Sequence, residues 1–177
     1  MKTLSIILLI LSLSIPEGTD QSAPACTISF TINNAGIDVD GTINVTQAEI
    51  NFHPDALDQS SIVATAAPAT IQTGISIRDK HLKRNDYFDA ARYPAIHLRS
   101  KSFRRIKKNA FIGEFNLTIK DITRPITITF TVSRNKNTLR YHGTFEINRL
   151  EFGLGESSAV LDENVKIVLE AIEPAPV

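Results

Sequence analysis

The side chains best suited to chemistry gather between Arg78 and Pro94, where the sequence reads RDKHLKRNDYFDAARYP. Arg78, Asp79 and His81 lie almost side by side in this segment. The planar guanidinium of an arginine donates two parallel hydrogen bonds to a phosphate, so one interpretation is a polar mouth that holds a phosphate, amide or quinone group. The other interpretation is that these side chains lock a short helix in place through buried hydrogen bonds, and we favour it.

The sequence contains no pattern typical of an enzyme or of a metal site. A catalytic triad needs a nucleophile, a base and an orienting acid, and the Gly-x-Ser-x-Gly pattern of one common nucleophile does not occur. The only cysteine is Cys26, and the four histidines (His53, His81, His97 and His142) lack the close spacing of a zinc site. We therefore predict a protein that is not an enzyme and that holds no metal ion or catalytic cofactor.

Residues 1–25 have the layout of a secretory signal peptide. Lys2 precedes an apolar run from Leu4 to Ile15, and helix-breaking residues follow it. This run is too short to span a bilayer, which takes about 20 residues. Small residues before Cys26 predict cleavage after Ala25, which leaves residues 26–177 as a single domain that is periplasmic or secreted.

Cys26 would be the first residue after that cleavage, the position of the lipidated cysteine in bacterial lipoproteins. Ala23 stands where such proteins normally have leucine. A lipid-anchored cysteine and a free thiol on a loose N-terminal tail therefore both remain open.

The 19 basic and 19 acidic side chains balance, so the net charge gives no reason to expect nucleic acid or an anionic membrane surface as a partner.

Around the charged segment, apolar and polar residues alternate in short stretches, as in half-buried strands. The apolar phase changes near Thr46 and Gln47, which predicts a β-bulge or a tight turn there. We count roughly eight antiparallel strands. Residues 74–90 break the alternation, and we expect them to form one or two short helices beside an opening, with a helix cap at Asn85 or Asp86.

Phenylalanines dominate the apolar phase of these strands. Six of them should point into the interior: Phe30, Phe52, Phe111, Phe115, Phe130 and Phe145. A fully packed core is one interpretation. A barrel of about eight strands that keeps a cavity for a small ligand is the other, and periodicity does not separate the two.

Three groups of motifs resemble the YceI-like family of exported bacterial lipid-binding proteins, between about Thr27 and Ile172. They are Thr73-Gly74 with Arg78-Asp79-Lys80-His81-Leu82, Asp86-Tyr87-Phe88-Asp89 and Tyr93-Pro94-Ala95-Ile96; Gly113-Glu114-Phe115-Asn116-Leu117-Thr118-Ile119 with Thr123-Arg124-Pro125-Ile126; and Asn148-Arg149 with Phe152-Gly153 and Asp162-Glu163-Asn164-Val165. The resemblance implies an all-β, lipocalin-like, extended antiparallel β-barrel that binds a polyisoprenoid or similar long-chain lipid in its pore. Relatives have a Phe-Phe pair where this chain has Tyr87-Phe88.

With this resemblance, the strand phases give a candidate site. The expected pore lining is Phe30, Ile43, Phe52, Phe111, Phe115, Leu117, Phe130, Tyr141 and Phe145, and the expected mouth or lid is Arg78, Asp79, His81, Tyr87 and Phe88. We expect a binding protein that sequesters or carries a long-chain lipid. Two alternatives are an isoprenoid-quinone carrier that serves a membrane partner protein in electron transfer, and a ligand-free periplasmic stress or interaction protein. A dimer is one option for the oligomeric state, which the sequence leaves open.

Overall fold

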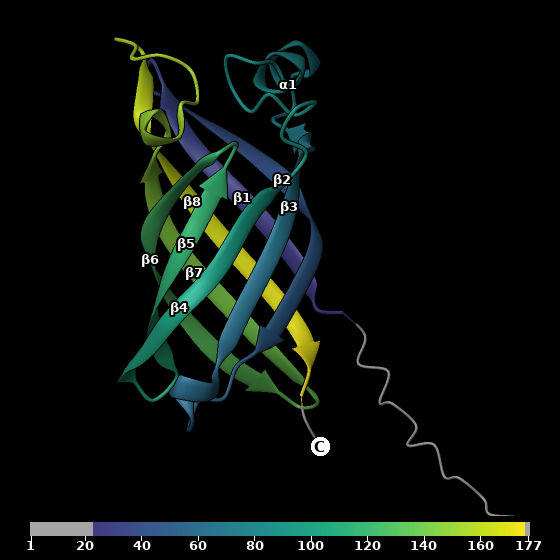
Figure 1. The fold of residues 1–177 in the computed structure, drawn as a ribbon, viewed down its shortest axis with the longest axis vertical. Coiled ribbons are helices and arrows are strands. Elements are labelled where there is room, and N and C mark those ends of the chain that lie inside the picture. Colours follow the sequence, from purple (N-terminus) through teal and green to yellow (C-terminus); the bar gives the residue numbers. More distant parts are fainter. Residues whose placement is uncertain (1–22, 176–177) are drawn as a thin grey trace, which may run out of the picture.

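The computed structural model describes residues 23–175, which form one closed barrel of eight strands (Figure 1). The strands are β1 (Ala25–Asn34), β2 (Ile37–Asn51), β3 (Ser61–Gln72), β4 (Ile96–Lys107), β5 (Ala110–Ile119), β6 (Ile122–Asn135), β7 (Thr138–Asn148) and β8 (Leu161–Pro174). The helices in this part of the chain are α1 (Ser76–Leu82) and two 3-10 turns, η1 (Leu57–Gln59) and η2 (Arg149–Phe152). Most of the predicted signal peptide, residues 1–22, lies outside the described residues.

Each strand pairs antiparallel with its neighbours in sequence, and β1 closes the barrel against β8. The alternation along β6 shows why these residues form strands: Ile128, Phe130 and Val132 are buried, and the threonines between them are exposed. The predicted all-β antiparallel barrel with a short helix is confirmed.

Two of the register shifts in the wall lie between the neighbouring strands β2 and β3. In β2 the register with β3 shifts between Val45 and Gln47, which confirms the predicted bulge. In β3 a larger bulge contains Pro68, which has no amide hydrogen to donate. The hydroxyl of Thr70 accepts from the amide of Asn44 at 2.9 Å and donates to the Ala67 carbonyl at 2.6 Å, so a side chain replaces the missing ladder bonds.

The α1 segment emerges where β3 and β4 separate. Their ladder has four pairs, from Val63↔Arg99 to Ala66↔Ile96. Residues 73–95 leave the wall beyond it and lie at one end of the barrel, here called the upper end (Figure 1).

The second helical turn that we considered at Asn85 or Asp86 does not form. Instead, the amides of Phe88 and Ala90 donate back to the carbonyls of Leu82 and Lys83 at the end of α1. These bonds fold the segment into successive turns, because the amides that a new helix would use are already committed.

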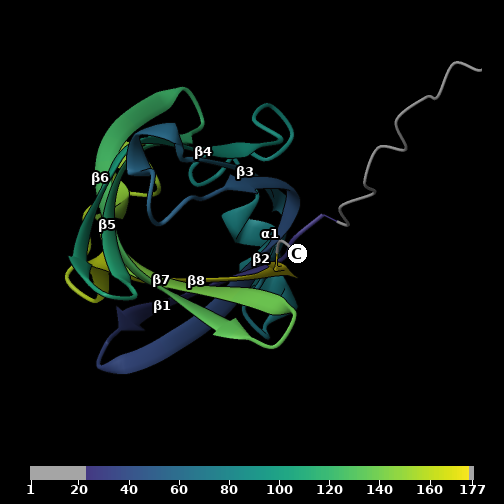
Figure 2. The same ribbon diagram turned by 90° about the horizontal axis from the view of Figure 1, so that it is seen from below.

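The lower end of the barrel is filled by aromatic rings. Phe52 lies edge-to-face against Phe103, Phe111 and Phe130, with ring centroids 5.3, 4.9 and 5.3 Å apart. Edge-to-face packing is a preferred geometry of aromatic pairs. Figure 2 looks at the barrel from this end. The cluster fills the interior at this end next to β4, β5 and β6.

Candidate ligand cavity

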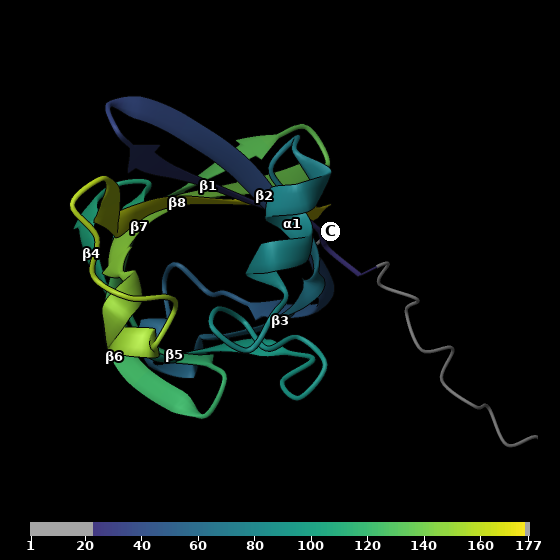
Figure 3. The same ribbon diagram turned by 90° about the horizontal axis from the view of Figure 1, so that it is seen from above.

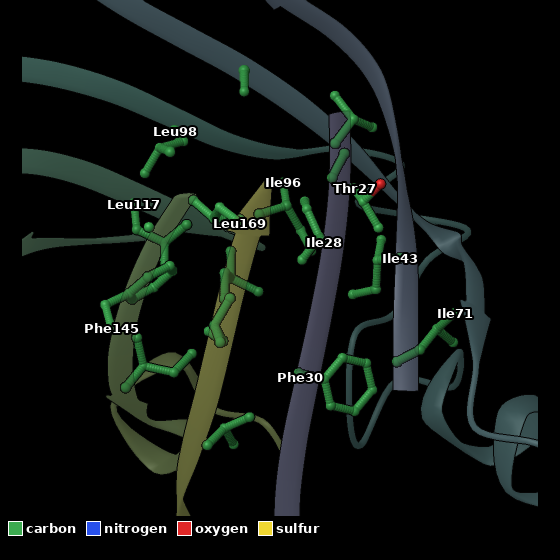
Figure 4. Close-up of a pocket in the computed structure, with 18 of the residues that line it drawn as sticks. Thr27, Ile28, Phe30, Ile43, Ile71, Ile96, Leu98, Leu117, Phe145 and Leu169 are labelled. Atoms are coloured by element: carbon green, nitrogen blue, oxygen red, sulfur yellow. The ribbon is translucent and has the colours of Figure 1, made fainter. Parts of the chain in front are cut away.

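Above the phenylalanine cluster lies a cavity of about 400 Å³, lined by side chains from all eight strands and from the α1 segment. Figure 4 shows part of this lining, with Ile28, Phe30, Ile43, Leu117 and Leu169 among the labelled side chains. The wall is almost wholly aliphatic and aromatic. Such a surface can hold an apolar molecule by removing it from water, but it offers few groups for acid–base chemistry.

Seven of the nine side chains expected to line the pore do line this cavity: Phe30, Ile43, Phe115, Leu117, Phe130, Tyr141 and Phe145. Phe52 and Phe111 do not. Both are buried in the lower cluster, Phe52 directly after the last residue of β2 and Phe111 near the start of β5. The strand phase placed them correctly inside, but both are packed among the other rings of the lower cluster instead of lining the cavity.

Phe30, the phenylalanine of β1, packs against a glycine on the neighbouring strand β2. Phe30 pairs with Gly41, and the Phe30 ring occupies the space that a side chain at Gly41 would need. A β-carbon at Gly41 would collide with the ring. The glycine therefore lets an aromatic side chain lie flat against the wall instead of blocking the cavity.

Arg78 and Asp79 anchor α1 through one residue, Thr73. The Asp79 carboxylate accepts from the Thr73 amide at 2.8 Å and from its hydroxyl at 2.6 Å. Arg78 donates through Nε to the same hydroxyl at 2.7 Å and through Nη2 to the Thr73 carbonyl at 2.6 Å. Arg78 also lines the cavity, whereas Asp79 does not. These bonds are of the kind expected of a structural lock, although His81, which the predicted lock included, bonds to Asp86 instead.

His81, Tyr87 and Phe88 complete the upper wall of the cavity. His81 Nε2 lies 2.6 Å from the Asp86 carboxylate, and this hydrogen bond holds the pKa of Asp86 below its ordinary value. The side chain of His81 is 51% exposed, so the cavity reaches the surface at this point. Phe88 packs against two of the buried clusters and ties the α1 segment to the wall.

The loop between η2 and β8 covers the upper end from the other side (Figure 3). The amide of Gly155 donates to the Asp86 carbonyl at 2.8 Å, and the Tyr87 ring lies against Gly155. The φ of Gly155 is +71°, and a β-carbon there would lie 2.9 Å from the ring, so glycine is needed for two reasons. This contact joins the two covering segments.

Arg149 is a cavity residue that the strand phases did not identify. It is 3% exposed and donates to the carbonyls of Leu154, Glu156 and Asp162 at 2.7, 2.8 and 2.9 Å. No described carboxylate forms an ion pair with it. A buried charge is tolerated here because carbonyl dipoles replace its water. Its sequence signal is the Asn148-Arg149 motif, which carries no information about burial.

Polar groups also meet near the lower end. The Tyr141 hydroxyl donates to the Glu173 carboxylate at 2.6 Å. Burial raises the pKa of Glu173, although the hydrogen bond from Tyr141 acts in the opposite direction. Burial and the neighbouring Glu173 carboxylate both raise the pKa of the Tyr141 hydroxyl. Burial and the charge of Glu173 also raise the pKa of the Cys26 thiol, which disfavours the reactive thiolate.

Cys26 does not lie on a loose tail, as one interpretation had it. It pairs with Ala171 in the β1–β8 ladder and lines the cavity.

Within residues 23–175, no cluster of histidine, cysteine or carboxylate side chains could hold a metal ion, and no helix has the length and apolarity to cross a membrane.

Known proteins share this architecture. The YceI-like domain family matches residues 21–172, and the chain belongs to that family. A relative named UPF0312 protein, from Pseudomonas savastanoi pv. phaseolicola, is 24% identical over 156 residues, which cover 82% of this chain and 81% of the relative.

Two solved structures show the same fold. BcnA of Burkholderia cenocepacia superimposes with a TM-score of 0.79 at 22% identity and covers 83% of this chain and 95% of its own. A polyisoprenoid binding domain from Saccharophagus degradans, implicated in plant cell wall breakdown, superimposes with a TM-score of 0.68 at 13% identity and covers 88% of this chain and 97% of its own.

Proposed function

We propose that this protein is an exported binding protein, not an enzyme, that holds a long-chain polyisoprenoid or similar amphiphile in its barrel. The observation that carries the proposal is the cavity of about 400 Å³ with an almost wholly apolar wall. Its volume falls within the roughly 300–1,000 Å³ of small-molecule sites. The Saccharophagus relative in fold is a polyisoprenoid binding domain by name, which supports an isoprenoid over other apolar chains.

The driving force is burial of the chain. Each methylene removed from water contributes about 0.8 kcal/mol, and part of the total is offset by the lost freedom of a flexible ligand. His81 and Arg149 bring polar groups to the upper part of the lining, so a polar head would lie at that end with its tail below.

Export belongs to the same proposal. A signal peptide over residues 1–25 would place the domain in the periplasm or outside the cell. The thiol of Cys26 lies in the cavity wall, which supports an unmodified cysteine over a lipid anchor. The intact mass of the mature protein, purified from its own cell envelope, tests both the cleavage site and the modification.

The decisive experiment extracts the purified protein with organic solvent and records mass and ultraviolet spectra. We expect a long-chain lipid in about equal molar amount to the protein. A quinone chromophore would support the alternative of a carrier for membrane electron transfer. An extract without lipid would contradict the proposal and support a ligand-free interaction or stress protein.

A matched pair of variants ties the lipid to the cavity. Ala66 is buried in the lining of β3, whereas Ala69 of the same strand is exposed. Ala66→Phe should fill part of the cavity and lower the lipid recovered severalfold, with a change in stability within about 1–2 kcal/mol because the ring occupies empty space. Ala69→Phe should retain the lipid of the unmodified protein. Equal lipid in both variants would place the ligand elsewhere.

A further inference from the structure

Large apolar side chains that face water are concentrated at the upper end of the barrel. Among residues 23–175, six are exposed, and four of these lie around the upper end: Ile37, Ile75, Ile77 and Val160. Ile77 of α1 is 76% exposed and Ile37 of the β1–β2 hairpin 70% exposed. Scattered single exposures are ordinary, whereas grouped ones mark contact surfaces.

The outer face of α1 combines this apolar surface with positive charge. Ile77 and Lys80 of α1 lie three residues apart on the helix. They line one shallow surface hollow with Arg78, His81 and Arg84, the last of which lies two residues beyond the end of α1. Neither Lys80 nor Arg84 forms an ion pair within the described residues. The nearby carboxylates of Asp79 and Asp86 are hydrogen-bonded to Thr73 and His81. Arg84 interacts with Asp86 through space without a close ion pair, so both cations of this face remain available to an anionic surface.

The inner face of the same helix lines the cavity through Arg78 and Leu82. Only the width of this one short helix therefore separates the interior of the barrel from the exposed Ile77. A long apolar chain that left the cavity beside the half-exposed His81 would emerge next to α1, and passage through water from there would be unfavourable for it.

We infer that the outer face of α1, here the exposed side chains of Ile77 and Lys80 together with Arg84 just beyond the helix and Ile75 just before it, docks on the surface of an anionic phospholipid bilayer. Apolar side chains flanked by cations are the composition of helices that lie in a membrane interface, and the cations match anionic head groups. Docking brings the upper end of the cavity to the bilayer, where a lipid can pass between the two. Membrane docking is a separate property from the proposed lipid binding, and vesicle binding can be measured whether or not a lipid occupies the cavity.

The absence of tryptophan from the chain makes the test site-specific. In Ile77→Trp the only tryptophan reports on the docking face, and in Ile106→Trp it reports on an exposed isoleucine near the lower end of β4. Adding vesicles of phosphatidylethanolamine with about one third phosphatidylglycerol should shift the emission of Ile77→Trp to shorter wavelength. Neutral phosphatidylcholine vesicles should not, and Ile106→Trp should be unaffected by either.

Co-sedimentation with the same vesicles measures the charge contribution. Lys80→Gln with Arg84→Gln should lower the vesicle affinity about tenfold or more, while Ile106→Ser should bind as the unmodified protein does. All substituted side chains are exposed, and an unchanged melting temperature checks that each variant is folded. Equal shifts at positions 77 and 106, or no shift at 77, would overturn the inference. A blue shift that grows with protein concentration without vesicles would assign the face to a second copy of the chain and overturn it as well.

Discussion

Arg149 shows how a single charged side chain can be buried without an ion pair. Its guanidinium holds the loop between η2 and β8 by donating to carbonyls at both ends of that loop. The residue therefore shapes the upper end of the cavity through the backbone, and its positive charge remains part of the lining.

Replacing Arg149 should destabilise the whole barrel. Arg149→Met keeps the apolar stem but leaves several carbonyls without donors, and we expect a loss of about 3 kcal/mol in the free energy of unfolding. Urea denaturation measures it. Arg140→Met, an exposed arginine on β7, is the control and should stay within about 0.5 kcal/mol. Equal stability of both variants would mean that the buried hydrogen bonds contribute little.

Glu173 should give the stability a pH dependence. Its pKa is raised in the folded protein from an ordinary value of 4.5, so the native state holds its proton more tightly than the unfolded state does. Stability from this group is therefore full below the unfolded pKa and is lost as pH rises through the folded pKa. The effect is small because solvent partly screens the group.

The measurement is the difference in melting temperature between Glu173→Gln and the unmodified protein across pH 4 to 8, a window set by that raised pKa. The glutamine still accepts a hydrogen bond from Tyr141 and does not titrate. The unmodified protein should lose stability relative to Glu173→Gln as pH rises. A constant difference between the two would show that the Glu173 carboxyl keeps its ordinary pKa.

At the scale of elements, α1 is held mainly by the bonds between Arg78, Asp79 and Thr73. Arg78→Ala removes two charged-group hydrogen bonds at the start of the segment, and we expect a loss of about 2 kcal/mol with the lipid still bound in the folded fraction. Asn85→Ala, at an exposed position that caps no helix, is the control. Melting curves and lipid extracts on both variants decide the matter. Loss of lipid without loss of stability would instead make Arg78 a head-group ligand.

The sequence predicted which residues form strands and face inward better than it predicted where along the barrel each inward side chain lies. Alternation identified which residues of each strand face inward, and the phase change at Thr46 located a bulge. Neither signal reports the height of a residue along the barrel axis, so Phe52 and Phe111 could not be separated from Phe30 and Phe145. The contact between Gly155 and the α1 segment was also invisible, because it joins two loops that are distant in sequence.

At the scale of the whole molecule, closure of the sheet determines which changes the fold can accept. The barrel has no free edge strand, because β1 pairs with both β2 and β8.

The net charge of the chain was a poor guide to its surfaces, since the basic outer face of α1 exists within a chain of net charge zero. Global composition averages over regions that the fold keeps apart.

Closure also predicts that the chain can be reconnected. Ala25 and Ile172 are register partners, so a short glycine linker could join the two ends of the barrel near its lower end. New termini between Lys136 and Asn137, in the exposed β6–β7 turn, would leave all eight strand pairings intact. The permuted protein should unfold cooperatively and retain its lipid. A second permutant opened between Thr129 and Phe130, inside β6, should fail to fold because it divides a ladder. If the turn permutant also fails, chain order as well as closure must be essential to folding.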